Sequence, residues 1–429
     1  EFPSIGDLPY FVTLGPHSFY WFSIEPGSTG GRVSTDEDAP ALPRLTVSGN
    51  WETLFTGDSR RRFADRLSAY LLDRRWFGGK AKKIKGTQIV DVIPIAFDNR
   101  QARLLFIQVD YTEGDADTYV LPVSFATGEQ AEQLTTYQAH SIVALLTANG
   151  EDGVLFDAMF DPAFPPVILD AISKRRRLRG ERGNISATPT RQFRELYGGA
   201  DANREPHIVR TEQSNSSVIF GDRFILKLYR RLDQGLNPDL EIGRFLTERM
   251  DSTAFSQTAR VAGSIEYSVG EGRNERSMTL GILQGFVPNE GDAWTYTLDM
   301  IDDYFEQMLA ARPEVEAPRR ATGALLDLAA GETPDEVREH VGTYLQDARL
   351  LGQRTAEMHL ALNADGDDQA FRAEPFSMLY QRSIYQSLRG QATQVFATLR
   401  KRADTLPEGI QPDISQLLDQ QAALLERYR

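Results

Sequence analysis

The feature of this sequence that most constrains its fold is a change in hydrophobic periodicity near Pro288. Before this proline, short alternating runs bounded by turn residues predict mainly strands. After it, apolar residues recur at three- and four-residue steps almost to the end of the chain, which predicts helices. At 429 residues the chain can bury more than one core, and we expect about three domains.

The strand-rich part divides into two predicted modules. In the first, residues 58–76 predict an amphipathic helix capped by Asp58 or Ser59. Three strands with turns between them follow, at residues 87–96, 102–112 and 117–125, and further on residues 165–178 predict a helix. The second module, residues 191–287, holds a hairpin, one helix and two further strands. The helices or helix pairs predicted after Pro288 cover residues 294–311, 335–362, 375–406 and 414–428.

Composition excludes several classes of function. The net charge of −14 argues against non-specific binding to nucleic acid or to an acidic membrane, and the basic run at residues 174–179 is typical of a solvated helix end. No run of apolar residues is long enough to span a bilayer, and no signal pattern opens the chain, so we expect a cytoplasmic location. The chain has no cysteine, and its five histidines are not at zinc-ligand spacing, so we expect no metal site of that kind.

One lysine stands out in the stretch QSNSSVIFGDRFILKLYRR, residues 213–231. Two strands are predicted here, joined by a two-residue turn at Gly221-Asp222. Lys227 shares a strand face with Ile225 and Tyr229, so its ammonium group must reach either an anion or water. The hairpin alone leaves both alternatives open.

The helix predicted after the hairpin favours the anion. Asn237 is the expected N-cap of a helix running to about Met250, and Glu241 lies beside a stripe of Ile242, Phe245 and Leu246 that is expected to be buried. A strand lysine paired with a helix glutamate is the arrangement by which kinases hold nucleotide phosphates. We therefore predict that Glu241 holds Lys227.

Two polar segments flank this arrangement. Ser214, Ser216 and Ser217 precede or open the hairpin and are candidate hydrogen-bond donors to a phosphate group, although the segment lacks the glycine triad of protein kinases. Gln284, Phe286 and Val287, after the last predicted strand, are candidate adenine contacts. An ordinary polar turn and a plain connector are the alternatives for the two segments.

With these pieces together, the sequence resembles the maltokinases, which are aminoglycoside-phosphotransferase-like enzymes. The resemblance spans about residues 45–429. It rests on DRRWFGGKAKKI (73–84), EQSNSSVIFGDRFILKLYRRL (212–232), GLNPDLEIGRFLTE (235–248) and LGQRTAEMHLAL (351–362). It implies ATP-dependent phosphorylation of maltose to maltose 1-phosphate, with Mg²⁺, in the metabolism of trehalose to glycogen or α-glucan.

The resemblance also implies a domain organisation. It predicts an α+β, bilobal, protein-kinase-like fold with an N-terminal cap subdomain at residues 46–190, a nucleotide-binding lobe at 191–287 and a largely helical, partial C-lobe at 288–429. Residues 1–26 resemble the last strands of a trehalose synthase β domain, and residues 27–45 are a predicted linker. The expected partners are ATP, maltose and a trehalose synthase domain in cis or in trans. The double glycine of RWFGGK predicts a tight turn in the cap.

The expected catalytic loop is not recognisable. Kinases of this type need a His-x-Asp loop and a second Asp for Mg²⁺, but His359 is the last histidine, and residues 365–368 are more typical of a solvated turn than of a cation loop. The catalytic residues therefore stay unassigned, no metal ligand is assigned, and we expect the chain, apparently truncated, to be inactive by itself. The alternatives are a non-catalytic pseudokinase or scaffold of a trehalose synthase fusion, or a kinase for another small molecule.

Overall fold

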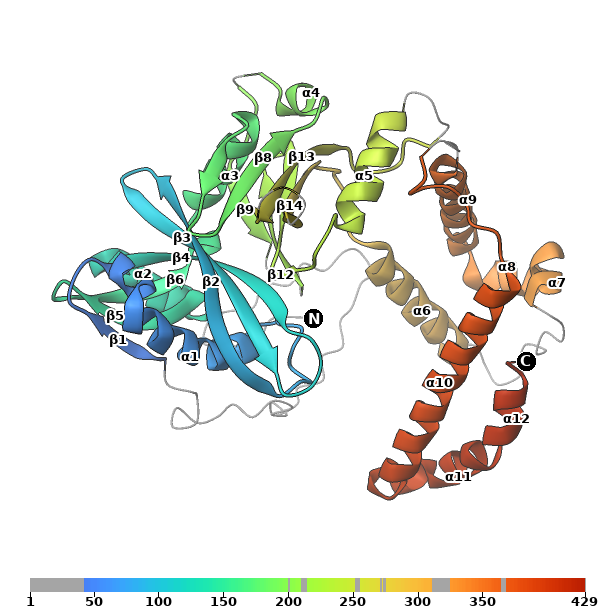
Figure 1. Ribbon diagram of the computed structural model, residues 1–429. Coiled ribbons are helices and arrows are strands. Elements are labelled where there is room, and N and C mark those ends of the chain that lie inside the picture. Colours follow the sequence, from blue (N-terminus) through green and yellow to red (C-terminus); the bar gives the residue numbers. More distant parts are fainter. Residues whose placement is uncertain are drawn as a thin grey trace.

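The structure is a computed structural model that describes residues 42–199, 201–209, 214–250, 255–270, 272, 275–310, 325–363 and 368–428. It has a mixed α+β fold in which two sheets lie next to each other and a helical part follows them (Figure 1). The mixed α+β class confirms that part of the prediction, whereas the kinase-like arrangement of two lobes stays a prediction. The strands predicted at residues 2–26 lie outside the described residues, as does the predicted linker up to residue 41.

The first sheet contains the strands predicted for the cap. Its order is β1-β5-β6-β4-β3-β2, antiparallel except for the parallel pair β1–β5. The strands are β1 (Arg44–Val47), β2 (Ile84–Phe97), β3 (Arg100–Tyr111), β4 (Asp117–Thr127), β5 (Ile142–Ala148) and β6 (Glu151–Asp157). A seventh strand, β12 (Arg231–Leu232), comes from the second module and pairs with β4. The three strands predicted in this module are confirmed as β2, β3 and β4.

Helix α1 (Gly57–Asp73) packs on this sheet through Phe63, Leu67 and Leu71, which are all buried. The helix begins at Gly57, with Thr56 as its N-cap, so the prediction of Asp58 or Ser59 as the cap is wrong. It ends three residues before Trp76. The double glycine does form a tight turn, in which a Cβ on Gly79 would lie 2.4 Å from the Tyr111 hydroxyl. The shorter helices here are η1 (Trp51–Phe55), α2 (Gly128–Tyr137), η2 (Ala139–Ser141) and η3 (Ala158–Phe160).

The second sheet is antiparallel, with the order β7-β8-β13-β14-β11-β10-β9. Its strands are β7 (Arg177–Arg179), β8 (Gly183–Pro189), β9 (Pro206–Val209), β10 (Asn215–Phe220), β11 (Phe224–Tyr229), β13 (Val261–Val269) and β14 (Arg276–Gly285). The associated helices are α3 (Phe164–Ser173), α4 (Phe193–Tyr197) and α5 (Pro238–Arg249). Because β7 and β8 pair into this sheet, the predicted boundary at residue 190 does not separate the two sheets. The basic side chains after α3 are exposed, as predicted, but residues 177–179 form β7 and not the end of the predicted helix.

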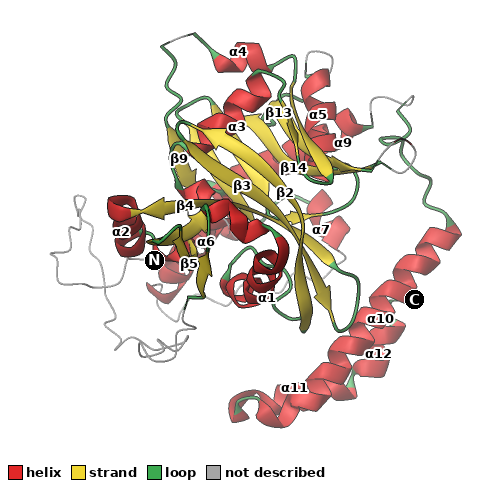
Figure 2. Ribbon diagram, turned by 60° about the vertical axis from the view of Figure 1, so that its left-hand side comes forward, coloured by secondary structure: helices red, strands yellow, loops and turns green. Residues whose placement is uncertain are grey.

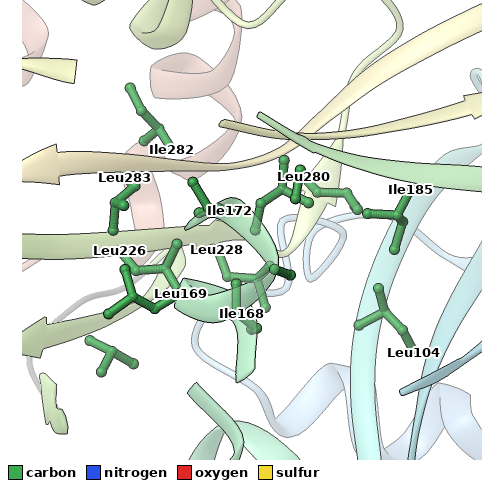
Figure 3. Packing of buried hydrophobic residues seen from close by; sticks show 14 of the residues in the cluster. Leu104, Ile168, Leu169, Ile172, Ile185, Leu226, Leu228, Leu280, Ile282 and Leu283 are labelled. Carbon is green, nitrogen blue, oxygen red and sulfur yellow. The ribbon is translucent and has the colours of Figure 1, made fainter. Parts of the chain in front are cut away.

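A continuous core joins the two sheets. Leu104 of β3 belongs to the same buried cluster as Leu226 and Leu228 of β11 and Ile172 of α3 (Figure 3). Asp91 of β2 adds polar contacts: its carboxylate accepts hydrogen bonds from the backbone N–H groups of residues 181, 182 and 183 and from the Tyr267 hydroxyl at 2.8–3.1 Å. The first sheet is therefore fastened to the second by both apolar and polar contacts.

The helical part contacts the second sheet through α5. Ala361 of α9 is buried with Phe245 and Leu246 of α5, and the Phe371 ring stacks on Phe245 at 3.7 Å. Helix α10 extends away from both sheets (Figure 2). The helices are α6 (Ala293–Ala310), α7 (Leu325–Ala330), α8 (Asp335–Val341), α9 (Tyr344–Leu362), α10 (Met378–Arg402), η5 (Ala403–Thr405), η6 (Glu408–Ile410), α11 (Gln411–Asp419) and α12 (Gln421–Glu426).

Each helix or helix pair predicted after Pro288 has a counterpart, and the ranges 335–362 and 414–428 are helix pairs, α8 with α9 and α11 with α12. The break between α8 and α9 lies at Gly342, whose φ of 59° is in the left-handed region that favours glycine. Among the described helices, none combines the length and the apolar character that a membrane crossing requires.

Candidate functional site

The hairpin that carries Lys227 is formed by β10 and β11. Phe220 pairs with Phe224, so three residues form the turn, rather than the two predicted. Gly221 has a φ of 55°, and a Cβ there would lie 2.2 Å from the Asn203 carbonyl oxygen. This position therefore favours glycine, whose backbone lies against the segment before β9.

The Lys227 side chain is 29% exposed and has an acidic partner on α5. Its Nζ lies 3.8 Å from Oδ2 of Asp239, and the Tyr229 hydroxyl donates a hydrogen bond to the same oxygen at 2.9 Å. Asp239 is in the first turn of α5, where the predicted N-cap Asn237 accepts a hydrogen bond from its backbone N–H. The lysine is thus held at the N-terminal end of the helix, which itself favours negative charge.

The acid beside Lys227 differs from the predicted one. Within the described residues the ion pair is with Asp239, whereas Glu241 forms none with Lys227. The physical reason is the rotation of α5 about its axis. Gly243 faces the sheet, since a Cβ there would lie 2.8 Å from Val261 Cγ2, and residues two positions apart point in widely different directions on a helix.

The same rotation changes the predicted apolar stripe of α5. Phe245 and Leu246 are buried, but Ile242 is 38% exposed, so its assignment to the buried stripe was wrong. The structure does not test whether Glu241 contributes to phosphate binding, and that role stays a prediction.

Cross-strand register gathers several predicted residues on one face of the second sheet. Ser217 pairs with Lys227, and Gln284 pairs with Ile225, two residues before the lysine. Because directly opposed residues point to the same side of an antiparallel sheet, Ser217, Lys227 and Gln284 lie on one face. Ser217 and Gln284 are buried, so the exposed polar group among the three is the Lys227 ammonium.

The other predicted residues lie elsewhere. Ser216 is on the opposite face, where its hydroxyl accepts a hydrogen bond from Arg230 Nε at 2.8 Å. Ser214 is exposed just before β10. Phe286 and Val287 follow β14, and the Phe286 N–H donates to the Arg223 carbonyl oxygen at 2.9 Å, which ties this segment to the hairpin turn. Adenine binding by Gln284, Phe286 and Val287 stays a prediction.

A cavity of about 440 Å³ lies between the two sheets, next to the hairpin. Its walls come from the C-terminal end of α1, from the η2 and η3 segments and from β9, β10 and the residue after β11. The lining residues are Tyr70, Asp73, Arg74, Arg75, Trp76, His140, Asp157, Met159, Phe160, Ile208, Val209, Asn215, Ser216, Ser217 and Arg230.

A buried ion pair lies in this wall. Arg230 Nη2 lies 2.6 Å from Asp157 Oδ2, and the two side chains are 0% and 2% exposed. Burial raises the pKa of the Asp157 carboxyl, a larger effect than the lowering by the Arg230 guanidinium and the Met159 N–H. Burial likewise raises the pKa of the neighbouring Tyr70 phenol, with the Asp157 charge as a further cause. The pair joins the end of β6 to the end of β11.

Two N–H groups of this wall lack a hydrogen-bond acceptor in the part of the chain that the structure describes. They are Nε of Arg74 and Nη1 of Arg230. The Arg230 guanidinium also lies 5.2 Å from the centre of the Trp76 ring, and the Arg74 guanidinium lies 4.5 Å from that of Tyr70. Sequence reasoning gave these residues no role, although Arg230 follows Lys227 closely and Trp76 lies within the RWFGGK motif.

No metal centre can be assembled from the described residues, because no three His, Asp or Glu side chains among them are grouped closely enough to bind an ion. We therefore assign no Mg²⁺ ligand and no step that uses one. Residues 365 and 367 of the acidic turn lie outside the described residues, whereas Asp368 accepts a hydrogen bond from the Ala370 N–H.

A comparison with known families bears on the first sheet. The family model of the maltokinase N-terminal cap domain matches residues 70–161. This stretch begins near the end of α1 and runs through β2 to β6 and η3. It includes the wall of the cavity that Trp76, His140 and Asp157 form.

Proposed function

We propose that the chain is the nucleotide-binding part of a maltokinase. The match of residues 70–161 to the maltokinase cap domain suggests a phosphotransferase. The proposed reaction transfers the γ-phosphoryl group of ATP to the anomeric hydroxyl of maltose. The observation that carries the proposal is the cap match, together with a strand lysine held by a helix carboxylate on the module that follows. A strand lysine with a helix acid is the device by which kinases hold nucleotide phosphates.

Each residue on the Lys227 face has a proposed task. The Lys227 ammonium binds the nucleotide phosphates, and Asp239 with the Tyr229 hydroxyl keeps it in place. Ser217, opposite Lys227 in the register, borders the phosphates, and Gln284 borders the base. The bound ATP would supply the phosphoryl group, and these side chains would position it.

We also propose that residues 1–429 by themselves bind nucleotide without turning it over. His340 and His359 are the histidines after Pro288, and neither is followed two residues later by aspartate. A kinase uses the aspartate of that pattern to orient the attacking hydroxyl. The proposed partner that completes the pathway step is a trehalose synthase domain, in cis or in trans.

Calorimetric titration with a non-hydrolysable ATP analogue tests the nucleotide site. We expect Lys227→Met to weaken binding about tenfold or more, because it removes a charge-assisted contact to phosphate. Lys174→Met is the matched control, since Lys174 lies at the exposed end of α3 and pairs with Asp170. Comparing Asp239→Asn with Glu241→Gln then identifies the acid that holds the lysine.

The outcomes separate the alternatives. Equal affinity in Lys227→Met and Lys174→Met contradicts the proposed nucleotide site. Absence of any nucleotide binding favours the non-catalytic scaffold. Formation of maltose 1-phosphate by residues 1–429 with ATP and maltose contradicts the proposed inactivity, but it supports the maltokinase assignment.

A further inference from the structure

Lys227 is not among the residues that line the cavity between the two sheets. Ser216 lines it from the face of β10 opposite to Lys227, and Asn215 and Ser217, which share the Lys227 face, also border it. Its volume of about 440 Å³ is within the range of small-molecule sites. Nothing in the proposed nucleotide site uses Arg74, Trp76, Asp157 or Arg230, so the cavity needs its own explanation.

The unmet hydrogen-bonding groups of the cavity wall define the chemistry of a ligand. Both are guanidinium N–H donors, Arg74 Nε and Arg230 Nη1, and both are buried. Buried donors without acceptors are destabilising and rare in folded proteins, so a group that offers acceptors is the complement that this wall lacks. We propose that the cavity is a binding site for a small oxyanion, carried by a phosphate or carboxylate group.

The charges of the wall agree with an anion. Three arginines and two aspartates line the cavity, which leaves a net charge of +1 from these five side chains (3 − 2 = 1) in a protein whose net charge is −14. Arg230 pairs with Asp157 through its Nη2 group, and Arg74 contacts Asp73 and the His140 carbonyl oxygen. Arginine is well suited to this role because its fork of donors matches the geometry of phosphate and carboxylate.

Part of the cavity wall is apolar, so it can hold the organic part of a molecule that carries the anionic group. Trp76, Phe160 and Ile208 give the cavity apolar sides, and Trp76 is only half-buried. A sugar ring packs well against an aromatic side chain while its substituent phosphate meets the arginines. The ligand would contact the cap through Trp76 and the second sheet through Asn215 and Ser216, so it would bridge the two.

Calorimetric titration of residues 1–429 tests the proposal with four probes at constant ionic strength: inorganic phosphate, glucose 6-phosphate, glucuronate and glucose. We expect one-site binding of at least one anionic probe, with a Kd below about 1 mM, and no binding of glucose. Arg74→Gln should weaken this binding about tenfold or more, since it removes a charged donor. Arg74→Lys, which keeps the charge but lacks the Nε–H group, should weaken it less and serves if Arg74→Gln does not fold.

Arg103→Gln is the matched control. Arg103 and Arg74 are both 16% exposed, each guanidinium lies over an aromatic ring, and each pairs with an acid, but Arg103 is outside the cavity. Anion binding should be unchanged in Arg103→Gln and in Lys227→Met. Equal affinity for inorganic phosphate and glucose 6-phosphate identifies free phosphate as the ligand source, and tighter binding of glucose 6-phosphate or glucuronate identifies an organic anion.

Three results would overturn the proposal. The first is that no anionic probe binds at about 10 mM, well above the expected Kd. The second is that both Arg74 variants bind as tightly as the unchanged chain, or no less tightly than Arg103→Gln. The third is loss of anion binding in Lys227→Met, which would place the anion at the nucleotide site instead.

Discussion

Asp157→Asn is the substitution whose effect follows most directly from the structure. The amide has nearly the volume of the carboxylate, and its oxygen can still accept the hydrogen bond that Asp157 receives from the Met159 N–H at 3.0 Å. The change therefore isolates the loss of one charge. It leaves the Arg230 guanidinium fully buried, with the Ser216 hydroxyl and the Trp76 ring as its remaining neighbours.

The expected effect is large because an uncompensated charge stays in the interior. Breaking a buried pair by removing one partner costs about 3–5 kcal/mol of the free energy of unfolding. At about 2–4 °C of melting temperature per kcal/mol for a domain of this size, the midpoint should fall by about 6–20 °C. Thermal unfolding followed by tryptophan fluorescence measures it, and Trp76, one of the four tryptophans, lies beside Arg230.

Two variants control this measurement. Glu266→Gln breaks the pair with Arg244, in which both side chains are 31% exposed at 3.6 Å, and such pairs contribute about 0–1 kcal/mol. The double variant Asp157→Asn with Arg230→Gln removes both buried charges and should be more stable than Asp157→Asn alone. If Asp157→Asn lowers the midpoint no more than Glu266→Gln does, the reasoning about the buried pair is refuted.

Gly243→Ala and Gly352→Ala should change stability in opposite directions, as thermal unfolding can measure. A Cβ at Gly243 would lie 2.8 Å from Val261 Cγ2, so overpacking should destabilise the fold by about 1–3 kcal/mol. Gly352 in α9 has open space around it, so alanine there should stabilise the fold by about 1 kcal/mol through its higher helix propensity. A loss of stability at both sites contradicts the packing argument. Burial is the first cause that raises the pKa of four tyrosine phenols, so the folded state resists their ionisation and stability should be lost as pH rises above the ordinary value of about 10. Absorbance at alkaline pH should show these phenols ionising together with unfolding, and ionisation of all tyrosines near the ordinary value, with the fold intact, contradicts it. The four are Tyr70, Tyr111, Tyr119 and Tyr267.

Local features of the fold could be predicted from the sequence because they depend on neighbouring residues. The alternating runs gave β2 to β4, and Asn237 with Pro238 marked the start of α5, because periodicity and capping are properties of a few consecutive side chains. Pairing between distant segments could not be predicted in this way. Neither the addition of β7 and β8 to the second sheet nor that of β12 to the first has a local signal.

The candidate site shows the same division. Lys227 and its face could be predicted, since strand alternation alone places its side chain. The choice between Asp239 and Glu241 could not, because it depends on how α5 is rotated, and Gly243 sets that rotation through its contact with β13. The buried pair of Arg230 and Asp157 was also missed, since the two residues are 73 positions apart in the chain.

The pairing of β12 with β4 has a consequence for the engineering of such chains. The two strands share the register Arg231 with Tyr119 and Leu232 with Thr118, and the Val120 N–H donates to the Arg230 carbonyl oxygen at 2.8 Å. The cap is thus not a detachable module joined through one connection at its C-terminal end. A chimera that exchanges the cap must also exchange the segment around β12. Otherwise the edge of the first sheet would be left unpaired and the buried Arg230 would lose its acidic partner.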